Sequence, residues 1–326
     1  MRIAQFIASD GWGGAEKVFV NLCNALAAEN EVTALTYDNP AFVRHLDPRV
    51  RHVLVPCTSR HNPSVYWMLY RFLKPSRFDI VHTHCAKASG IIYALSRFLP
   101  LRQVATKHNP RKGEIFEKVR HVTAVSMSAA KTIRQGAPVI YNGIVPVAIT
   151  PGDEPHAPLR MLAIGRLDPV KGFDHLIEQA ACLKMDYRLD IIGDGPQRAA
   201  LQRQIDEASL SEKVRLVGYC DNIPERMRDA DLVIISSHSE GFPLVLVESL
   251  FYAKVLVSTP VSDAPALLDA ALLAEQEHVA EKIMEVARDF VAYRNLFRAV
   301  QQTNRDRFRI ETIAKSYVAY YGTLCE

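Results

Sequence analysis

Residues 159–172 read LRMLAIGRLDPVKG, and this stretch decides the fold. An apolar run over 159–164 ends at a glycine, and a helical pattern follows over 173–184. A nearly continuous apolar run of this length is typical of a strand buried on both faces. Buried strands that alternate with helices build a parallel sheet covered on both sides. The stretch therefore predicts the doubly wound α/β class.

The same alternation fills both halves of the chain. In the second half we expect strands at 159–164, 188–192, 214–217, 232–236 and 255–258, and helices at 173–184, 197–208, 223–229 and 243–252. In the first half we expect strands at 3–8, 31–37, 52–55, 79–83, 103–106, 122–125 and 139–141, and helices at 15–28, 64–73, 87–98 and 126–134. From residue 275 onward the pattern is almost wholly helical.

A polar stretch with four prolines, at residues 146, 151, 155 and 158, separates the two halves and predicts a linker. We therefore expect two Rossmann-like domains that face each other across a deep crevice, with ligands at the carboxyl ends of the strands. The N-terminal domain is expected over 1–147, completed by 305–326 if the C-terminal helices return to it. The C-terminal domain is expected over 158–304.

Charge is divided unevenly between the halves. The net charge of the 326 residues is +3. Residues 1–150 hold 19 Lys or Arg against 9 Asp or Glu, a net of +10, and residues 151–326 hold 20 against 27, a net of −7. The near-neutral total gives no reason to expect nucleic acid as a partner. The opposite signs favour an anionic partner for one half, with drift in composition as the alternative.

The cysteines and the N-terminus bear on location. The six cysteines are scattered without short paired spacings, so we expect reduced packing residues in a cytosolic protein. The first residues run directly into a strand, so no signal peptide is expected. The longest apolar runs are far shorter than the roughly 20 residues of a membrane span. We expect a cytoplasmic protein, with peripheral attachment to the inner face of the plasma membrane as an option.

Two cations follow the first strand of the second half. Arg166 and Lys171 lie five residues apart between a strand and a helix. Arginine can hold a phosphate in a bidentate fork, and lysine adds a compact charge. A diphosphate leaving group needs such neutralisation where no metal supplies it, and few acidic residues lie nearby to hold magnesium. The alternative is a solvated basic loop.

Two carboxylates, Glu240 and Glu248, flank the start of a later helix. Gly241 and Pro243 open that helix, and proline suits a first helical turn because the amide it lacks would have no helical partner there. The carboxylates could hold hydroxyl groups at two ends of an extended ligand, or both could be solvated. The Gly13-Gly14 turn after the first strand is a weaker signal, because Glu16 breaks a dinucleotide fingerprint.

These motifs occur together and in order. They are Gly13-Gly14-Ala15-Glu16, the segment around His108, Val139–Ile144, Gly165-Arg166-Leu167 with Lys171-Gly172, Ile192–Pro196 and Glu240–Glu248. The set resembles the family 4 retaining glycosyltransferases of the GT-B fold, of the type that builds bacterial lipopolysaccharide and surface polysaccharide. The resemblance covers residues 1 to about 268, and the ordered set is far more specific than any one motif.

The resemblance implies a nucleotide-diphosphate sugar as donor, a UDP-sugar ahead of GDP-mannose. Arg166 and Lys171 would clamp the diphosphate and stabilise the leaving nucleotide, and Glu248 would bind the ribose hydroxyls. Glu240 would hold the transferred hexose or N-acetylhexosamine together with the backbone of Gly241, Phe242, Pro243 and Leu244. The implied transfer retains the anomeric configuration and needs no metal and no cofactor.

On the other domain, the resemblance implies that the Gly13-Gly14 turn faces the diphosphate and the acceptor. His108 would contact the donor sugar and the reacting region, which makes it a catalytic candidate beside Glu240, Arg166 and Lys171. The implied acceptor is a lipid-linked saccharide or lipopolysaccharide. Candidates for its cleft are Trp12, His84 and Asn109.

The chain departs from the family pattern in two places. Ala253-Lys254-Val255 stands where a Gly-x-Pro is common, and Val261–Leu268 stands where a Gly-Gly turn and a further glutamate are common. A shortened segment to about residue 275 follows. That loop normally lies near the donor, so the departures leave the donor open.

Other interpretations remain. His82-Thr83-His84-Cys85 has the spacing of metal ligands, but no second cluster completes a zinc site, and packing is favoured. The aromatic and basic stretch 65–74 either packs on the sheet or lies at an anionic membrane surface. A sugar-nucleotide isomerase on the same fold and a non-catalytic nucleotide-sugar-binding subunit are the competing functions.

Overall fold

The computed structural model describes residues 1–56, 62–150, 152 and 154–325. The chain divides into two compact units, unit 1 over Met1–Val145 with Arg307–Glu326, and unit 2 over Pro146–Asp306. Pro151 of the expected linker lies outside the described residues.

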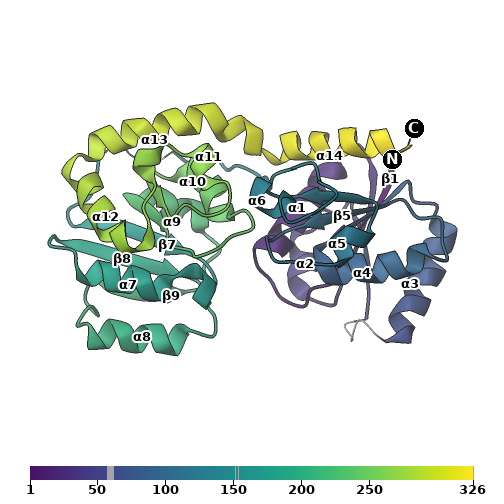
Figure 1. Cartoon of the computed structure of the whole chain (residues 1–326), viewed down its shortest axis with the longest axis horizontal. Coiled ribbons are helices and arrows are strands. Elements are labelled where there is room, and N and C mark those ends of the chain that lie inside the picture. The colour runs from purple at the N-terminus through teal and green to yellow at the C-terminus, as the bar shows by residue number, and fades with distance from the viewer. Residues whose placement is uncertain (57–61, 151, 153, 326) are drawn as a thin grey trace. The chain divides into compact units, whose positions relative to one another are not determined.

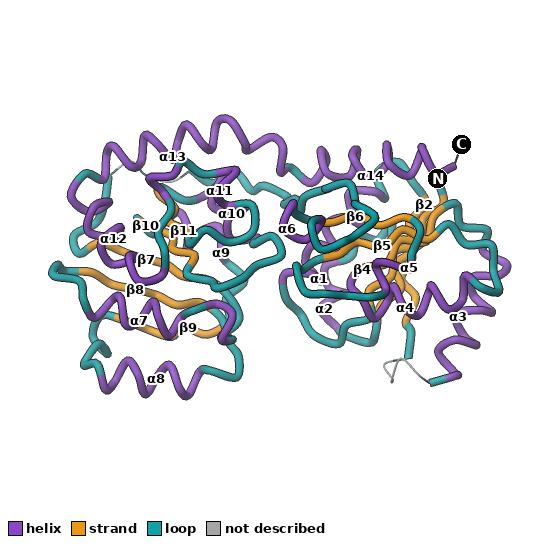
Figure 2. The backbone as a smooth tube through the Cα atoms, viewed as in Figure 1, coloured by secondary structure: helices purple, strands orange, loops and turns teal. Residues whose placement is uncertain are grey.

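Unit 1 contains a six-stranded parallel sheet in the order β3-β2-β1-β4-β5-β6 (Figures 1 and 2). Its strands are β1 (Arg2–Ile7), β2 (Glu31–Thr36), β3 (Arg51–Leu54), β4 (Ile80–His84), β5 (Gln103–Lys107) and β6 (His121–Ala124). Its helices are α1 (Gly14–Leu26), α2 (Pro40–His45), α3 (Pro63–Ser76), α4 (Cys85–Ser96), α5 (Ile115–Lys118), α6 (Met127–Ala130) and α14 (Ile310–Cys325).

Both faces of the unit 1 sheet are covered, because its strands are apolar on both sides. On one face Ile3 and Val32 pack with Phe19 of α1 and Tyr317 of α14. On the other face Phe6 packs in a cluster with side chains of α3 and α4. The last helix of the chain thus completes the core of the first unit and lies along α1 (Figure 1).

Unit 2 contains a five-stranded parallel sheet in the order β11-β10-β7-β8-β9. Its strands are β7 (Leu159–Ile164), β8 (Tyr187–Ile192), β9 (Val214–Gly218), β10 (Leu232–Ile235) and β11 (Val255–Ser258). Its helices are α7 (Phe173–Ala181), α8 (Arg198–Glu207), α9 (Ile223–Asp229), α10 (Leu244–Tyr252), α11 (Ala264–Leu267), α12 (Val279–Arg288) and α13 (Phe290–Asn304). In Figure 2, α7 and α8 cover one face of the sheet, and α10 and α13 cover the other.

Each sheet has a point where the strand order reverses, between β1 and β4 in unit 1 and between β7 and β10 in unit 2. Loops that leave the carboxyl ends of these strands diverge to opposite faces, which opens a place for a ligand. The Gly13-Gly14 turn follows β1 and His84 ends β4. Residues 165–172 follow β7 and residues 236–243 follow β10. The motifs of the sequence therefore lie at the two switch points.

The structure confirms the predicted doubly wound class and most predicted elements, and it corrects two. Val139 forms only an isolated bridge with Ala124, so the expected strand at 139–141 is absent. The expected helix at 126–134 is limited to Met127–Ala130. The hydroxyl of Thr132 donates to the carbonyl of Ala129 at 2.6 Å, a local hydrogen bond that competes with continuation of the helix. None of the helices over the described residues is long and apolar enough to cross a membrane.

Candidate active-site residues

Lys171 and Glu240 form an ion pair at the switch point of unit 2. The Lys171 Nζ lies 2.5 Å from Glu240 Oε1, and the same oxygen accepts a hydrogen bond from Ser237 Oγ at 2.8 Å. The side chains of Lys171 and Glu240 are 21% and 13% exposed. Both charges are thus held in fixed positions with limited access to water, which strengthens their interaction with a polar ligand.

The loops that carry this pair are locked to each other by backbone contacts. Gly172 has a φ of 61°, and a Cβ at this position would lie 2.3 Å from the carbonyl oxygen of Ser236, so only glycine fits. Ser236 Oγ donates to the Lys171 carbonyl at 3.0 Å, and the His238 amide donates to the Val170 carbonyl at 2.8 Å. The distance between the cation and the carboxylate therefore does not depend on flexible loops.

Arg166 lies in the same loop with its side chain 72% exposed, and it forms one long ion pair, Nε to Asp168 Oδ2 at 3.5 Å. The guanidinium is therefore held weakly and can turn toward an anion. The loop that carries Arg166 packs against the backbone of Gly193 (φ 140°), where a Cβ would lie 1.9 Å from the carbonyl oxygen of Gly165. The Gly-rich turn after β8 thus supports the turn after β7.

Helix α10 begins at Leu244, directly after the segment Glu240-Gly241-Phe242-Pro243. Pro243 caps the helix without a side-chain hydrogen bond, so the amides of Leu244 and its neighbour are offered to a ligand by the end of the helix. Phe242 is buried, and Glu248 lies one turn into the helix with its side chain half-buried. Ser262 Oγ donates to the Gly241 carbonyl at 2.6 Å. The segment that departs from the family pattern therefore supports this loop.

Lys254, in the other departure, has a structural partner. Its Nζ donates to Asp231 Oδ1 at 2.8 Å and to the Glu154 carbonyl, and both charged side chains are buried. Burial would raise the pKa of Asp231, but hydrogen bonds from Lys254, Arg160 and His156 outweigh it and lower that pKa. Asp229-Ala230-Asp231 has the Asp-x-Asp spacing that can bind a divalent cation, but the Asp231 carboxylate is already occupied by these donors.

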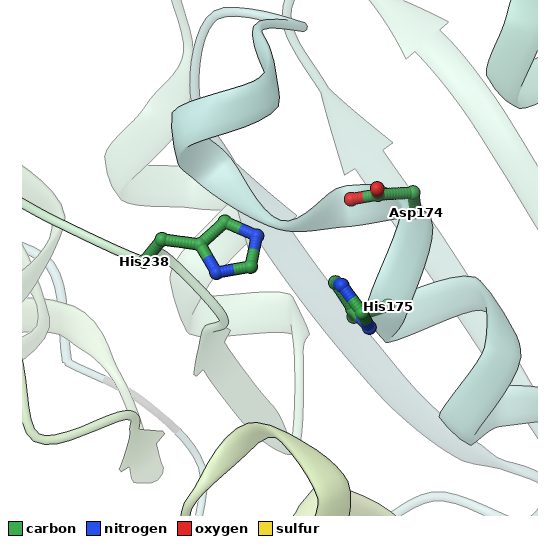
Figure 3. A group of neighbouring side chains, drawn as sticks. All are labelled: Asp174, His175 and His238. Carbon is green, nitrogen blue, oxygen red and sulfur yellow. The ribbon is translucent and has the colours of Figure 1, made fainter.

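Asp174, His175 and His238 form a cluster beside the same loops (Figure 3). One ligand atom from each lies within 4.8 Å of the others, whereas zinc ligands at about 2.0 Å from the metal lie about 3.3 Å apart. The two imidazole rings meet edge to face at 5.2 Å, and His175 Nδ1 pairs with Glu178 at 3.3 Å. These contacts account for the arrangement, and we assign no metal to it.

In unit 1, His108 follows β5 and contacts His84. His108 Nε2 lies 3.1 Å from His84 Nδ1, and His84 Nε2 lies 2.8 Å from Gln5 Oε1. His84 is fully buried, so it reaches a ligand only through the partly exposed His108. Burial lowers the pKa of His108 to about 4, and burial together with the charge of neighbouring histidines lowers the pKa of His84 well below the ordinary 6.5. Both imidazoles are therefore neutral at pH 7, and His108 acts as a hydrogen-bonding group rather than a cation.

The other acceptor-cleft candidates in unit 1 have local partners. The Trp12 ring stacks on His45 at 4.9 Å and meets Phe42 edge to face at 5.6 Å. Asn109 is exposed, and its side-chain oxygen accepts from the Arg111 amide at 3.1 Å. Gly13 caps α1 in an extended conformation.

Several residues that build these sites were not found from the sequence. Ser237 shares the Glu240 oxygen, and Gln276 donates to the Ser236 carbonyl at 2.9 Å from 40 residues away. Gln5 Oε1 lies 2.8 Å from His84 Nε2 across 79 residues of sequence, and the Tyr321 hydroxyl lies 2.6 Å from His82 Nδ1 across 239 residues. Only the Ser-Ser-His-Ser-Glu run carried a local signal, since its serines are adjacent to the carboxylate.

The chain matches two family models, one in each half. Residues 12–147 match the model "Glycosyltransferase Family 4", and residues 150–298 match "Glycosyl transferases group 1". Together the matches cover most of the chain, and they agree with the resemblance based on the motifs.

Individual relatives agree with these models. The chain is 26% identical over 288 residues, 79% of each sequence, to the GalNAc-α-(1→4)-GalNAc-α-(1→3)-diNAcBac-PP-undecaprenol α-1,4-N-acetyl-D-galactosaminyltransferase of Campylobacter jejuni. It is 26% identical over 48% of its length to the N-acetyl-α-D-glucosaminyl L-malate synthase of Bacillus anthracis, and this match spans 42% of the synthase. The structure of HepE of Anabaena in complex with UDP and glucose superposes with a TM-score of 0.87 at 18% identity, over 99% of this chain and 100% of HepE. This likeness confirms the GT-B fold.

Proposed function

Because the chain belongs to the glycosyltransferases, its halves matching the family 4 and group 1 models, we propose that it transfers a sugar from a nucleotide-diphosphate donor. The transferred group is a hexose or an N-acetylhexosamine, and the acceptor is a lipid-linked saccharide or lipopolysaccharide. The observation that carries the proposal is the partly buried Lys171–Glu240 pair at the switch point of unit 2, with Arg166 in the loop that also carries Lys171.

The chemistry of this pair fits loss of a nucleotide diphosphate. As the bond from the sugar to the diphosphate breaks, negative charge grows on the leaving oxygen. The Lys171 ammonium and the Arg166 guanidinium would stabilise that charge, and the amides at the start of α10 add to the positive potential. Glu240 would accept hydrogen bonds from sugar hydroxyls, and Glu248 from those of the ribose. We propose that this arrangement needs no metal and that the sugar keeps its anomeric configuration.

We further propose that unit 2 binds the donor and unit 1 the acceptor. A UDP-sugar is favoured over GDP-mannose, since HepE, with the same fold, is solved with UDP and glucose. The acceptor class is supported by the undecaprenol-linked substrate in the name of the Campylobacter relative. The neutral His108 would contact a hydroxyl near the reacting carbon. We propose that the reaction takes place at the cytoplasmic face of a membrane, where such an acceptor and a nucleotide sugar would meet.

A surface of unit 1 suits such a location. On α3 the Trp67 side chain is 63% exposed, and the Arg71 guanidinium lies 4.8 Å from the centre of its ring. Aromatic rings and cations of this kind bind the headgroup region of anionic membranes. Binding to vesicles with anionic lipid should weaken as salt is raised toward 1 M, where the Debye length falls to about 3 Å. Sedimentation with vesicles measures this, and binding that salt leaves unchanged would count against the surface.

A panel of nucleotide sugars tests the proposed function. The protein is incubated with each donor, with and without undecaprenol-linked saccharides and lipopolysaccharide cores, and the released nucleotide is measured. Acceptor-dependent release from a UDP-sugar is expected. An isomerase would convert the donor with no acceptor present, and a binding subunit would retain the donor and release no nucleotide. Either result would overturn the assignment.

A further inference from the structure

A continuous chain of hydrogen bonds runs through the core of unit 1 and ends at His108. From His108 it passes through His84 to Gln5, whose Nε2 donates to the Tyr321 hydroxyl at 3.2 Å. The Tyr321 hydroxyl lies 2.6 Å from His82 Nδ1, and His82 Nε2 lies 2.6 Å from Thr106 Oγ1. Thr106 Oγ1 continues to Thr123 Oγ1 at 2.7 Å and to the Tyr317 hydroxyl at 3.2 Å. All of these side chains except His108 are fully or almost fully buried.

The direction of donation follows from the amide of Gln5. Its Oε1 can only accept, so His84 Nε2 carries the proton of that imidazole. His84 is neutral, and its Nδ1 is then a lone pair that accepts a hydrogen bond from His108 Nε2. A neutral His108 with its proton on Nε2 has a lone pair on Nδ1.

The other half of the chain is consistent with the same direction. The Tyr321 hydroxyl accepts from Gln5 Nε2 and therefore gives its own proton to His82 Nδ1. His82 then donates from Nε2 to Thr106, whose hydroxyl donates onward. Every buried side chain of this network thus has at least one hydrogen-bond partner, which is the condition for burying so many polar groups in one core.

We propose that Tyr321 and Gln5 are positioning residues that fix His108 as the tautomer protonated on Nε2, so that its Nδ1 accepts a hydrogen bond from a substrate hydroxyl. The proposal rests on the proposed function only for the nature of that hydroxyl, a sugar hydroxyl of the donor or the acceptor. It also gives the last helix a role beyond packing. Tyr321 on α14 reaches Gln5 across 316 residues of sequence.

Nitrogen NMR of the ¹⁵N-labelled protein tests the tautomer without any substrate. Long-range ¹H–¹⁵N spectra distinguish the protonated from the unprotonated ring nitrogen of each neutral histidine, and the signals of His108 are identified by their loss in His108→Gln. A proton on Nε2 of His108 is expected. A proton on Nδ1 would overturn the proposal, because the whole chain would then run in the opposite direction. Since no transfer is measured, this result is independent of the proposed function.

The variant Tyr321→Phe tests the positioning residue, with Tyr320→Phe on the same helix as the matched control. Without the hydroxyl, nothing holds the Gln5 amide in one orientation, so both tautomers of His108 should appear. We expect kcat to fall about 10-fold to 100-fold, the range found for residues that orient metal-bound imidazoles, with little change in the KM for the donor. The control should match the parent protein in both measurements. If the folded Tyr321→Phe variant still shows only the Nε2-protonated tautomer of His108, Tyr321 does not position His108.

Discussion

Replacing Lys171 by alanine is expected to lower kcat about 100-fold to 1,000-fold while the variant stays folded. In the proposed function the ammonium group would stabilise charge that grows only as the nucleotide leaves, so its loss should affect the transition state more than donor binding. The variant also leaves the Glu240 carboxylate, 13% exposed, without the lysine cation but with the hydrogen bond from Ser237 Oγ. The Glu240 carboxylate, no longer neutralised by lysine, would repel the diphosphate of the donor, and this repulsion would lower kcat further.

Steady-state kinetics with a saturating acceptor measure this change. The matched control is Lys184→Ala, because Lys184 is an exposed lysine of the same unit that lies after the end of α7. Its kcat should equal that of the parent protein, and circular dichroism should show that both variants are folded at the assay temperature. Near-normal transfer by Lys171→Ala would exclude Lys171 from the stabilisation of the leaving group.

Unit 1 is expected to lose stability steeply as the pH falls from about 6.5 to about 4. The ordinary histidine pKa is 6.5, and burial, with a smaller contribution from the charge of His108, lowers that of His82 to about 3. Burial also lowers the pKa of His84 and, to about 4, that of His108. In this range the unfolded chain binds protons that the folded unit does not, so acid favours unfolding. Each such histidine contributes a slope of up to about 1.4 kcal/mol per pH unit.

Tryptophan fluorescence reports on this unit specifically, because the chain has two tryptophans and both, Trp12 and Trp67, lie in unit 1. Urea unfolding at a series of pH values gives the free energy of unfolding. His82→Gln removes one of the groups and should flatten the slope by about 1.4 kcal/mol per pH unit, whereas His175→Gln in unit 2 should leave it unchanged. A stability of unit 1 that is constant over this range would contradict the neutral, buried histidines.

The fold could be predicted because its signals are local. Buried parallel strands such as 159–164 are apolar on both faces, and turns such as Gly172 need a residue that accepts a positive φ. The two elements that the sequence predicts wrongly are the helix at 126–134 and the strand at 139–141, and local contacts account for both. Thr132 limits one predicted helix through a hydrogen bond to the Ala129 carbonyl, and Val139 has the composition of a strand but pairs at one residue only.

The candidate site was predictable to a different extent in each unit. In unit 2 the charges lie in short motifs, and the structure brings Lys171 and Glu240 together from 69 residues apart. In unit 1 the partners of His108 are Gln5 on the first strand and Tyr321 on the last helix, through His84. No periodicity or spacing links residues that far apart in sequence. Gln5 and Tyr321 come together because α14 packs against α1, and this packing of distant segments forms only when unit 1 folds.

The stoichiometry of the reaction in the presence of EDTA tests the proposed sugar transfer most sharply. Protein, a UDP-sugar and an undecaprenol-linked saccharide are incubated, and released UDP and extended saccharide are quantified in the same sample, with the new linkage assigned by NMR. Equal amounts of both products are expected, with a linkage that keeps the anomeric configuration of the donor. UDP released without extension of the saccharide, or a reaction that EDTA abolishes, would overturn the proposed metal-independent transfer.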